Sequence, residues 1–233
     1  MKAIFITGTD TGAGKTLISG LLGRYLLSKG YRVITQKWVA TGSKDFSLDI
    51  KQHLRLMGKT KRDITHYLPL VSPYNFTFPA SPHLASHMDK KSISINKIKK
   101  SFKLLAQRFD YVIVEGVGGA LVPITKKKLL IDIAKELKLP TVIVSGNKLG
   151  AINHTLLTIE SLVRRKMKIA GIIFNNQPTR GDKVILKDNP KIIREISGEN
   201  ILGILPWTKD KGELYRKFRP IGRKLTAYLE KKR

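Results

Sequence analysis

The sequence predicts an α/β fold, with a doubly wound, mainly parallel sheet and helices on both of its faces. Short apolar runs rich in β-branched residues alternate with longer segments of helical period, which is typical of a parallel sheet covered on both sides. A glycine-rich loop joins the first apolar run to the first helical segment. With 233 residues and 42% hydrophobic content, the chain can form one sizeable core, so we expect a single domain over residues 1–233.

The apolar runs predict the strands, and the segments of helical period predict the helices. The predicted strands are 3–7, 32–36, 111–114, 141–145, 169–174 and 201–205. The predicted helices are 15–28, 49–57, 93–108, 130–137, 151–166, 191–196 and 215–231. Short strands joined by right-handed crossovers give the doubly wound arrangement.

The segment 67–83 fits neither a helix nor a central strand, because prolines recur along it. Its prolines and aromatic residues are Pro69, Pro73, Tyr74, Phe76, Phe78, Pro79 and Pro82. We expect a long ordered loop on the strand-end side of the sheet. A linker to a smaller helical region is the alternative.

The chain is strongly basic, because 44 Lys and Arg residues against 17 Asp and Glu residues give a formal net charge of +27. Such a charge attracts polyanions, but nucleic-acid-binding modules concentrate their basic residues on one face or tail. Here the basic residues are scattered and are not interleaved with stacking aromatic residues. We therefore interpret the charge as a solvated, lysine-rich surface and do not expect a nucleic-acid partner, with a polyanion-binding role as the alternative.

Cysteine and long apolar runs are both absent from the sequence. The lack of cysteine excludes disulfides, thiolate metal sites and cysteine nucleophiles. No run reaches the roughly eighteen apolar residues of a membrane span, and the N-terminus enters a strand-like segment without a signal-peptide pattern. We expect a cytoplasmic protein that does not associate with membranes.

Residues 8–16, Gly-Thr-Asp-Thr-Gly-Ala-Gly-Lys-Thr, have the context of a phosphate-binding loop, after a first strand and at the opening of a helix. Backbone N–H groups and the helix N-terminus form a cradle for anions there. Lys15 can reach the β- and γ-phosphates of a nucleotide, and the Thr16 hydroxyl can bind Mg²⁺. Five residues separate Gly8 from Gly14, where the common pattern has four.

An acidic residue ends the third predicted strand. The carboxyl end of a parallel strand points into the crevice where open α/β sheets bind ligands. Glu115 can therefore hold Mg²⁺ beside Thr16. The glycines of the following segment, 116–119, let the backbone approach a phosphate or substrate closely.

A lysine and two aspartates follow the second predicted strand. Lys37 ends that strand and can stabilise charge on a transferring phosphoryl group. Asp49 is a candidate for a further Mg²⁺ ligand or for the N-cap of the next helix. Asp45 competes with Asp49 for the role of metal ligand.

Together these motifs resemble the dethiobiotin synthetase family. The matches are residues 8–11 with 14–16, Lys37 with 39–42, Asn75 and Pro79 with 81–83, 114–116 with 118–119, 148–150 with 152–154, Gly171 with Asn175, and 205–207. They run in order along nearly the whole chain, and the Gly-Thr-Asp-Thr start of the loop and the Lys-Leu-Gly-x-Ile-Asn-His segment are the most specific. The extra loop residue is itself a feature of the family, whereas Trp38 stands where the family usually has proline.

The resemblance implies an ATP-dependent ligase of biotin biosynthesis that uses Mg²⁺. The family condenses CO₂ with 7,8-diaminopelargonate, a diamine, through a carbamate and a carbamic–phosphoric anhydride, and it releases dethiobiotin, ADP and phosphate. Such chemistry depends mainly on placement and charge stabilisation, which fits a site without a nucleophilic side chain.

The resemblance also implies roles for individual residues. The implied nucleotide-binding residues are Gly12, Ala13, Gly14, Lys15, Thr16, Leu17, Asp49, Glu115, Gly116, Val117, Gly118, Asn175, Asn176, Leu205, Pro206 and Trp207. Among them, Asn175 would recognise the edge of the adenine, and the 205–207 turn would pack beside the base. The implied metal ligands are Thr16, Asp49 and Glu115. The implied catalytic residues are Lys37, Lys15 and Thr11, and the implied substrate contacts are Thr11, Lys37, Thr41, Gly150, Ala151 and Asn153.

The family acts as a homodimer in which the segment after the fourth strand reaches the partner's substrate. By similarity, residues 150–153 would open a helix whose exposed amides suit the distant carboxylate of the diamine. The alternative for Asn153 and His154 is a helix cap and a packed or exposed histidine.

Two other classes of function compete with this interpretation. A partitioning-type P-loop ATPase with nonspecific DNA binding would explain the charge, but such proteins generally carry a second lysine early in the loop, and positions 9–13 contain none. A polyanion-binding module with a degenerate nucleotide site is disfavoured by the intact Lys15, Thr16 and Glu115. A GTPase is disfavoured because residues 147–150, Asn-Lys-Leu-Gly, lack the Asp that recognises guanine.

Overall fold

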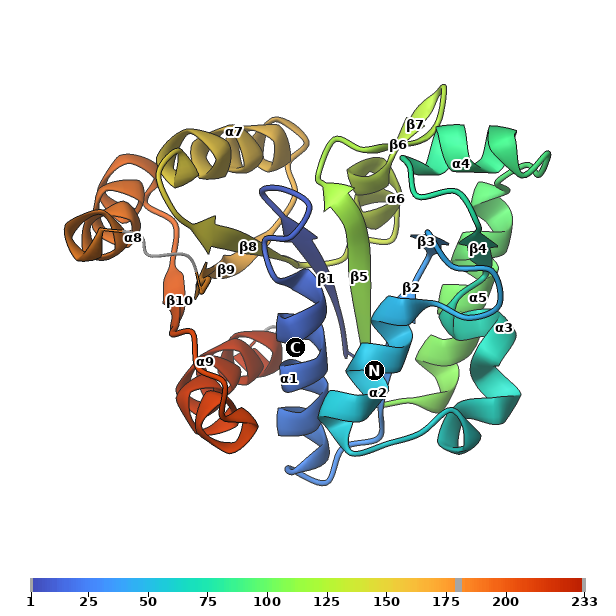
Figure 1. The fold of residues 1–233 in the computed structure, drawn as a ribbon, viewed down its shortest axis with the longest axis horizontal. Coiled ribbons are helices and arrows are strands. Elements are labelled where there is room, and N and C mark those ends of the chain that lie inside the picture. The colour runs from blue at the N-terminus through green and yellow to red at the C-terminus, as the bar shows by residue number, and fades with distance from the viewer. Residues whose placement is uncertain (1, 179–181, 232–233) are drawn as a thin grey trace.

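The fold is built on a six-stranded parallel sheet (Figure 1). The computed structural model describes residues 2–178 and 182–231. The strands of the sheet are β1 (Lys2–Gly8), β2 (Val33–Lys37), β5 (Tyr111–Gly119), β8 (Thr141–Asn147), β9 (Ile169–Asn176) and β10 (Ile201–Leu205). They lie in the order β10-β9-β8-β1-β5-β2, and every neighbouring pair is parallel. The first strand therefore lies inside the sheet with strands added on both sides, which confirms the predicted doubly wound fold.

Helices cover the two faces of the sheet because successive side chains of a strand point to opposite sides. In β1, Ile4 and Ile6 belong to one buried layer, which includes α1 (Lys15–Leu27) and α9 (Lys211–Lys231). Phe5 belongs to the other layer. That layer includes α5 (Ile95–Arg108), α6 (Leu130–Glu136) and α7 (Ala151–Arg164). The sheet thus lies between two helical layers, with its strands buried on both faces.

The segment 67–83, expected as a loop, contains short regular elements. A 3₁₀ helix, η1 (Arg62–Tyr67), leads into α3 (Leu68–Val71), β4 (Tyr74–Phe76) and α4 (Pro82–Met88). Its prolines are tolerated because Pro82 and Pro69 lie in the first turns of α4 and α3, where a backbone N–H has no partner within the helix. Among the residues that the structure describes, β4 pairs only with the short β3 (Val39–Thr41), outside the central sheet, so the exclusion of a central strand holds.

The helix expected over 191–196 begins earlier, and α8 spans Lys183–Ser197. Pro190 lies inside this helix, although a proline in a helix interior cannot donate to the carbonyl four residues back. In the structure that carbonyl, of Leu186, accepts a hydrogen bond of 2.9 Å from Asn147 Nδ2 instead. A side chain from β8 thus satisfies the group that the proline leaves without its partner.

The remaining predicted elements are present with shifted ends. α2 (Leu48–Met57) packs against α1 and lies beside β2, and β5 continues beyond the predicted 111–114 through Glu115 to Gly119. β6 (Pro123–Thr125) and β7 (Lys128–Leu129) form a small antiparallel ribbon that the sequence did not reveal. In the described part of the chain, no helix is long and apolar enough to cross a membrane.

Candidate active site

The loop between β1 and α1 has a backbone that suits glycine. Gly12 and Gly14 have φ angles of 80° and 106°, in the left-handed region. A Cβ atom added at Gly14 would lie 2.2 Å from Asn175 Nδ2, so a side chain has no room there. The loop ends at the N-terminus of a 13-residue helix, the place where backbone N–H groups and the helix dipole stabilise anions.

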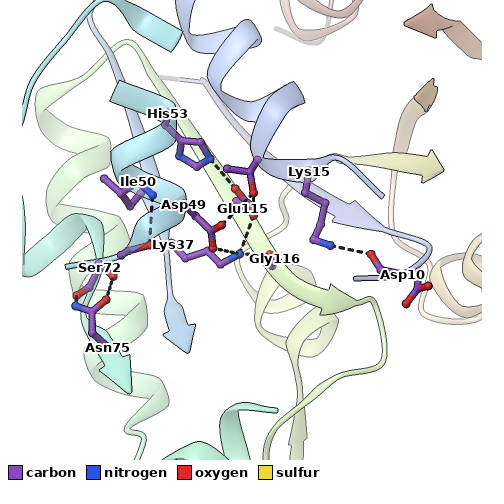
Figure 2. Close-up of polar contacts among 12 residues, drawn as sticks. Asp10, Lys15, Lys37, Asp49, Ile50, His53, Ser72, Asn75, Glu115 and Gly116 are labelled. Carbon is purple, nitrogen blue, oxygen red and sulfur yellow. Dashed lines mark hydrogen bonds and ion pairs between the residues drawn. The ribbon is translucent and has the colours of Figure 1, made fainter. Parts of the chain in front are cut away.

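Lys15 is the first residue of α1, and its side chain is almost fully buried. Its Nζ donates to the backbone carbonyl of Asp10 at 2.9 Å, so the ammonium group lies against its own loop (Figure 2). Burial, followed by repulsion from Lys37, lowers the pKa of Lys15 to about 8. An added negative charge, such as that of a bound phosphate, would stabilise this ammonium group.

Three oxygen-bearing side chains, predicted to share a metal ion, meet at the start of α1. Thr16 Oγ1 lies 3.0 Å from Glu115 Oε1 and 3.1 Å from Asp49 Oδ1. Glu115 comes from β5, which lies next to β1, and Asp49 comes from the first turn of α2. Segments far apart in the sequence therefore bring one hydroxyl and two carboxylates together beside the phosphate-binding loop.

Lys37 lies between the two carboxylates (Figure 2). Its Nζ is 2.7 Å from Glu115 Oε1, 2.9 Å from Asp49 Oδ2 and 2.8 Å from the carbonyl oxygen of Gly116. Three acceptors match the three hydrogens of an ammonium group. The side chain is only 5% exposed, so these contacts are shielded from water.

The charges in this cluster stabilise one another. Burial alone would lower the pKa of Lys37, but Glu115 and Asp49 outweigh it and raise that pKa above its ordinary value. Burial alone would raise the pKa of Glu115, but Lys37 and then His53 outweigh it and lower that pKa to about 2. At neutral pH the cluster therefore consists of an ammonium group and an ionised glutamate rather than a neutral pair.

Asp49 and Asp45 lie in different surroundings. Asp49 faces Thr16 and Lys37, whereas Asp45 is exposed and lines a separate hollow beside Phe46. The N-cap of α2 is Ser47, whose hydroxyl accepts from Ile50 N, so Asp49 does not serve as the cap. The side chain of Asp49 is thus directed to the cluster.

Sequence reasoning missed His53. This residue lies one helical turn after Asp49 on α2 and is fully buried. Its Nε2 is 2.6 Å from Glu115 Oε2, the carboxylate oxygen that Thr16 and Lys37 do not contact (Figure 2). The i, i+4 spacing of Asp49 and His53 was the available signal, because it places both side chains on one face of a helix.

Several predicted nucleotide-binding residues line one hollow of about 460 Å³ on the far side of the loop. Its lining residues are Gly12, Leu17, Asn175, Asn176, Gln177, Pro178, Pro206, Trp207, Thr208 and Leu214. Asn175 Nδ2 donates to the carbonyl of Ala13 at 3.1 Å, and Gln177 Nε2 donates to that of Gly12 at 2.7 Å. The end of β9 is therefore tied to the loop. Leu205 differs from the rest of this set, because its side chain is fully buried in the core.

The predicted substrate contacts lie on several elements around the loop. Thr11 is exposed, and its hydroxyl lies 3.7 Å from the position of a Cβ added at Gly118. Thr41 ends β3, Gly150 is the N-cap of α7 with φ of 85°, and Asn153 is exposed in the first turn of α7. Within residues 2–178 and 182–231, no hydrogen bond or ion pair joins Thr41, Gly150 or Asn153 to the Lys37 cluster.

The oxygen set fits Mg²⁺ better than a softer metal. Thr16, Asp49 and Glu115 supply one hydroxyl and two carboxylates, which are hard donors. No group of three or more His, Cys, Asp and Glu side chains suited to a metal occurs among the described residues. A site with so few protein ligands suits Mg²⁺ in particular, because this ion keeps several waters and binds substrate phosphates.

Comparison with known proteins identifies the family. A family model described as an AAA domain matches residues 2–213. The chain is 36% identical over 226 residues to the ATP-dependent dethiobiotin synthetase BioD of Thermodesulfovibrio yellowstonii, an alignment that covers 91% of this chain and 93% of the relative. It is 39% identical over 185 residues to BioD 2 of Haemophilus ducreyi, covering 78% of this chain and 86% of the relative. The chain belongs to the dethiobiotin synthetase family. The predicted resemblance is therefore confirmed, and with it the expectation of an ATP-dependent enzyme.

Solved structures with the same architecture include partitioning ATPases. The structure described as pNOB8 ParA bound to nonspecific DNA has a TM-score of 0.62 and 15% identity, covering 100% of this chain and 99% of that chain. The ParA family ATPase of Chlorobium tepidum TLS has a TM-score of 0.57 and 14% identity, covering 98% and 96%. At such low identity the similarity shows a shared fold alone.

Proposed function

We propose that this member of the dethiobiotin synthetase family is a cytoplasmic enzyme that forms dethiobiotin from 7,8-diaminopelargonate, CO₂ and ATP. The observation that carries the proposal is the convergence of Thr16, Lys37 and Glu115 beside the phosphate-binding loop. A P-loop with a buried ammonium group and two carboxylates at its helix start supports phosphoryl transfer from ATP. Relatives that share this sequence over most of its length are named as ATP-dependent dethiobiotin synthetases.

The proposed reaction has three bond-forming steps. One amine of the substrate attacks CO₂ and loses a proton, which gives a carbamate. A carbamate oxygen attacks the γ-phosphorus of ATP, forming a carbamic–phosphoric anhydride while ADP leaves. The second amine attacks the carbamoyl carbon, which closes the ureido ring, and phosphate leaves with the oxygen that came from CO₂.

Lys15 and the loop backbone hold the transferring phosphoryl group in this proposal. The pKa of about 8 for Lys15 reflects burial and a neighbouring cation rather than a local anion, so a phosphate at the loop would restore the charged form. Holding the phosphate in line with the carbamate supplies much of the rate, because little covalent chemistry is required of the protein.

Lys37 acts in the proposal as a stabiliser of charge and not as a base. Its raised pKa keeps it protonated at neutral pH, so it does not accept a proton from the substrate amines. Its ammonium group lies at the carboxyl end of β2, where the register pairs Lys37 with Glu115 of β5. A cation fixed there can neutralise the carbamate and the phosphoryl oxygens as charge develops on them.

Thr16, Asp49 and Glu115 would hold Mg²⁺. When bound, this ion would neutralise the β- and γ-phosphate oxygens of ATP. Asp49 and Glu115 both form ion pairs with Lys37, so the two carboxylates converge on one cation. The same convergence suits them to bind one divalent ion together.

The adenine is proposed to lie in the hollow formed by Asn175, Pro206 and Trp207. Trp207 is 48% exposed and so offers an aromatic face at the rim of that hollow. The opposite rim of the loop is proposed to receive the diamine at Thr11 and Thr41, with Gly118 close to Thr11.

A homodimer is proposed to complete the substrate site at the start of α7, around Gly150, Ala151 and Asn153. A hollow of about 330 Å³ lies beside this helix and is lined by Thr9, Leu121, His154 and Leu157, among others. Leu121 and Leu157 are 50% and 52% exposed, and such apolar groups next to a hollow support a contact with a second copy.

A product assay tests the proposal. The protein is incubated with the diamine, bicarbonate and MgATP, and dethiobiotin and ADP are measured. We expect equal amounts of both and no ADP release when the diamine is omitted. ATP hydrolysis that does not depend on the diamine but increases with added DNA would instead favour a partitioning-type ATPase.

A further inference from the structure

His53 occupies a position behind the carboxylate cluster where a polar side chain needs an explanation. The imidazole is fully buried, and its Nδ1 has no hydrogen-bond partner among the described residues. Burying a polar atom without a partner is unfavourable, and an apolar side chain of similar volume would avoid the cost. A histidine at this place therefore points to a role for its other nitrogen, Nε2.

The contact of Nε2 defines the direction of the hydrogen bond. Nε2 lies 2.6 Å from Glu115 Oε2, and an ionised carboxylate can only accept hydrogen bonds. Nε2 must therefore carry the proton and donate, in the neutral ring as well as in the charged one.

The two oxygens of Glu115 have separate partners. Oε1 contacts Thr16 Oγ1 at 3.0 Å and Lys37 Nζ at 2.7 Å, while Oε2 contacts His53 at 2.6 Å (Figure 2). Rotation of the carboxylate about its terminal bond would break the contacts on both sides. The terminal torsion of glutamate, χ3, has a broad energy minimum, so the carboxylate can otherwise rotate easily. The contact of Oε2 with His53 therefore helps to set the direction in which Oε1 points.

Helix α2 carries both Asp49, a proposed metal ligand, and His53, which contacts the proposed ligand Glu115. Asp49 and His53 are one turn apart on α2, and they face Thr16 and Glu115 respectively. A displacement of α2 would move both groups together, so the position of this helix is coupled to the geometry of the oxygen set. Supporting residues of this kind commonly change metal affinity by about 10- to 100-fold when they are removed.

We propose that His53 is a positioning residue, whose Nε2–H holds Glu115 Oε2 so that Oε1 faces Thr16 and the divalent ion of the nucleotide site. The inference rests on the proposed role of Glu115 as a metal ligand. His53 itself touches neither the nucleotide nor the substrate, since it lies behind Glu115 and has no exposed surface. It acts through the orientation of one carboxylate.

The test compares two substitutions of His53 by amide side chains of different length. In His53→Gln the amide nitrogen can occupy the place of Nε2, whereas in His53→Asn it falls near Nδ1 and cannot reach Glu115. Mn²⁺ is titrated into each protein saturated with ADP, without diamine or turnover, and free Mn²⁺ is followed by electron paramagnetic resonance. We expect His53→Asn to weaken Mn²⁺ binding by about tenfold or more. His53→Gln should retain most of the affinity.

Further variants separate this inference from the proposed function. Asp49→Asn and Glu115→Gln should weaken Mn²⁺ binding strongly, and Mn²⁺ affinity unchanged in both would contradict the metal site itself. If those two lose affinity but His53→Asn binds Mn²⁺ as tightly as His53→Gln, the His53 proposal is overturned alone. His53→Leu serves as an apolar variant of similar size, and the Gln and Asn pair decides the question if His53→Leu does not fold.

Discussion

Lys37 and Glu115 lie 78 residues apart in the sequence, yet their side chains form a buried ion pair with 2.7 Å between Nζ and Oε1. The strands that carry them are neighbours, and the two residues are register partners at the carboxyl end of the sheet. The pair lies beside Thr16, so an ammonium group, a carboxylate and a hydroxyl meet at the start of α1.

Replacement of Lys37 should impair catalysis. Lys37→Ala removes the cation between Glu115 and Asp49, and we expect kcat to fall at least about a hundredfold, as for the loss of one charge-stabilising donor. The control is Lys100→Ala, which removes an exposed lysine of α5 and should leave kcat unchanged. Steady-state kinetics of dethiobiotin formation check both, and near-normal turnover of Lys37→Ala would rule out its proposed role.

The two aspartates near α2 should differ in their effect on the metal requirement. Asp49→Asn removes a carboxylate that faces Thr16, so the Mg²⁺ concentration for half-maximal activity should rise at least about tenfold. Asp45→Asn changes an exposed residue in a separate hollow and should have little effect. Activity measured against free Mg²⁺ at fixed ATP distinguishes them, and equal Mg²⁺ curves for both variants would contradict the assignment of Asp49.

Two glycine variants separate backbone strain from loss of the nucleotide site. Gly14→Ala puts a Cβ 2.2 Å from Asn175 Nδ2 at a φ of 106°, so the tie between β9 and the loop must break. Gly30→Ala also has a positive φ, of 82°, but nothing lies within 4 Å of its Cβ. Both should lose roughly 1–2 kcal/mol of stability from strain. ATP affinity by calorimetry should fall only in Gly14→Ala, and equal ATP affinities in the two variants would be inconsistent with this explanation.

Asp110 should make stability depend on pH in acid. Hydrogen bonds from the Arg32 side chain, then from the Arg32 backbone N–H, lower the pKa of Asp110 from 3.8 to about 2. A carboxylate with a depressed pKa stabilises the folded state above its ordinary pKa, and this contribution disappears as the pH falls through the folded value. The unfolding temperature of Asp110→Asn should therefore lie below that of the unmodified protein at neutral pH and converge with it between about pH 4 and pH 2. A difference in unfolding temperature that does not change with pH would argue against this pair.

The sequence predicted the strand-end residues of the site because parallel strands place their carboxyl ends at one edge of a sheet. Lys37 ends β2 and pairs in register with Glu115 of the neighbouring β5, so their meeting required only the strand order. The phosphate-binding loop could also be predicted, because its residues are contiguous and join a strand to a helix.

Groups positioned by packing of helices were harder to predict. His53 lies on α2, and which face of α2 turns toward β5 depends on tertiary packing rather than on local pattern. The early start of α8 was missed because it depends on a contact between distant segments. The Leu186 carbonyl, which Pro190 leaves without its helical partner, accepts from Asn147 of β8. Leu205 was expected at the nucleotide as part of the 205–207 turn, and the structure places its side chain in the buried layer that includes α9.

Transfer of oxygen from CO₂ to phosphate tests the central claim most directly. The protein is mixed briefly with ¹⁸O-labelled bicarbonate, the diamine and MgATP, before bicarbonate exchanges its oxygen with water, and the released phosphate is analysed by mass spectrometry. If the carbamate oxygen attacks the γ-phosphate beside Lys15 and Lys37, each phosphate formed should carry one oxygen from the labelled carbon dioxide. Phosphate without that label, formed at the same rate with or without the diamine, would show simple hydrolysis of ATP and contradict the proposed reaction.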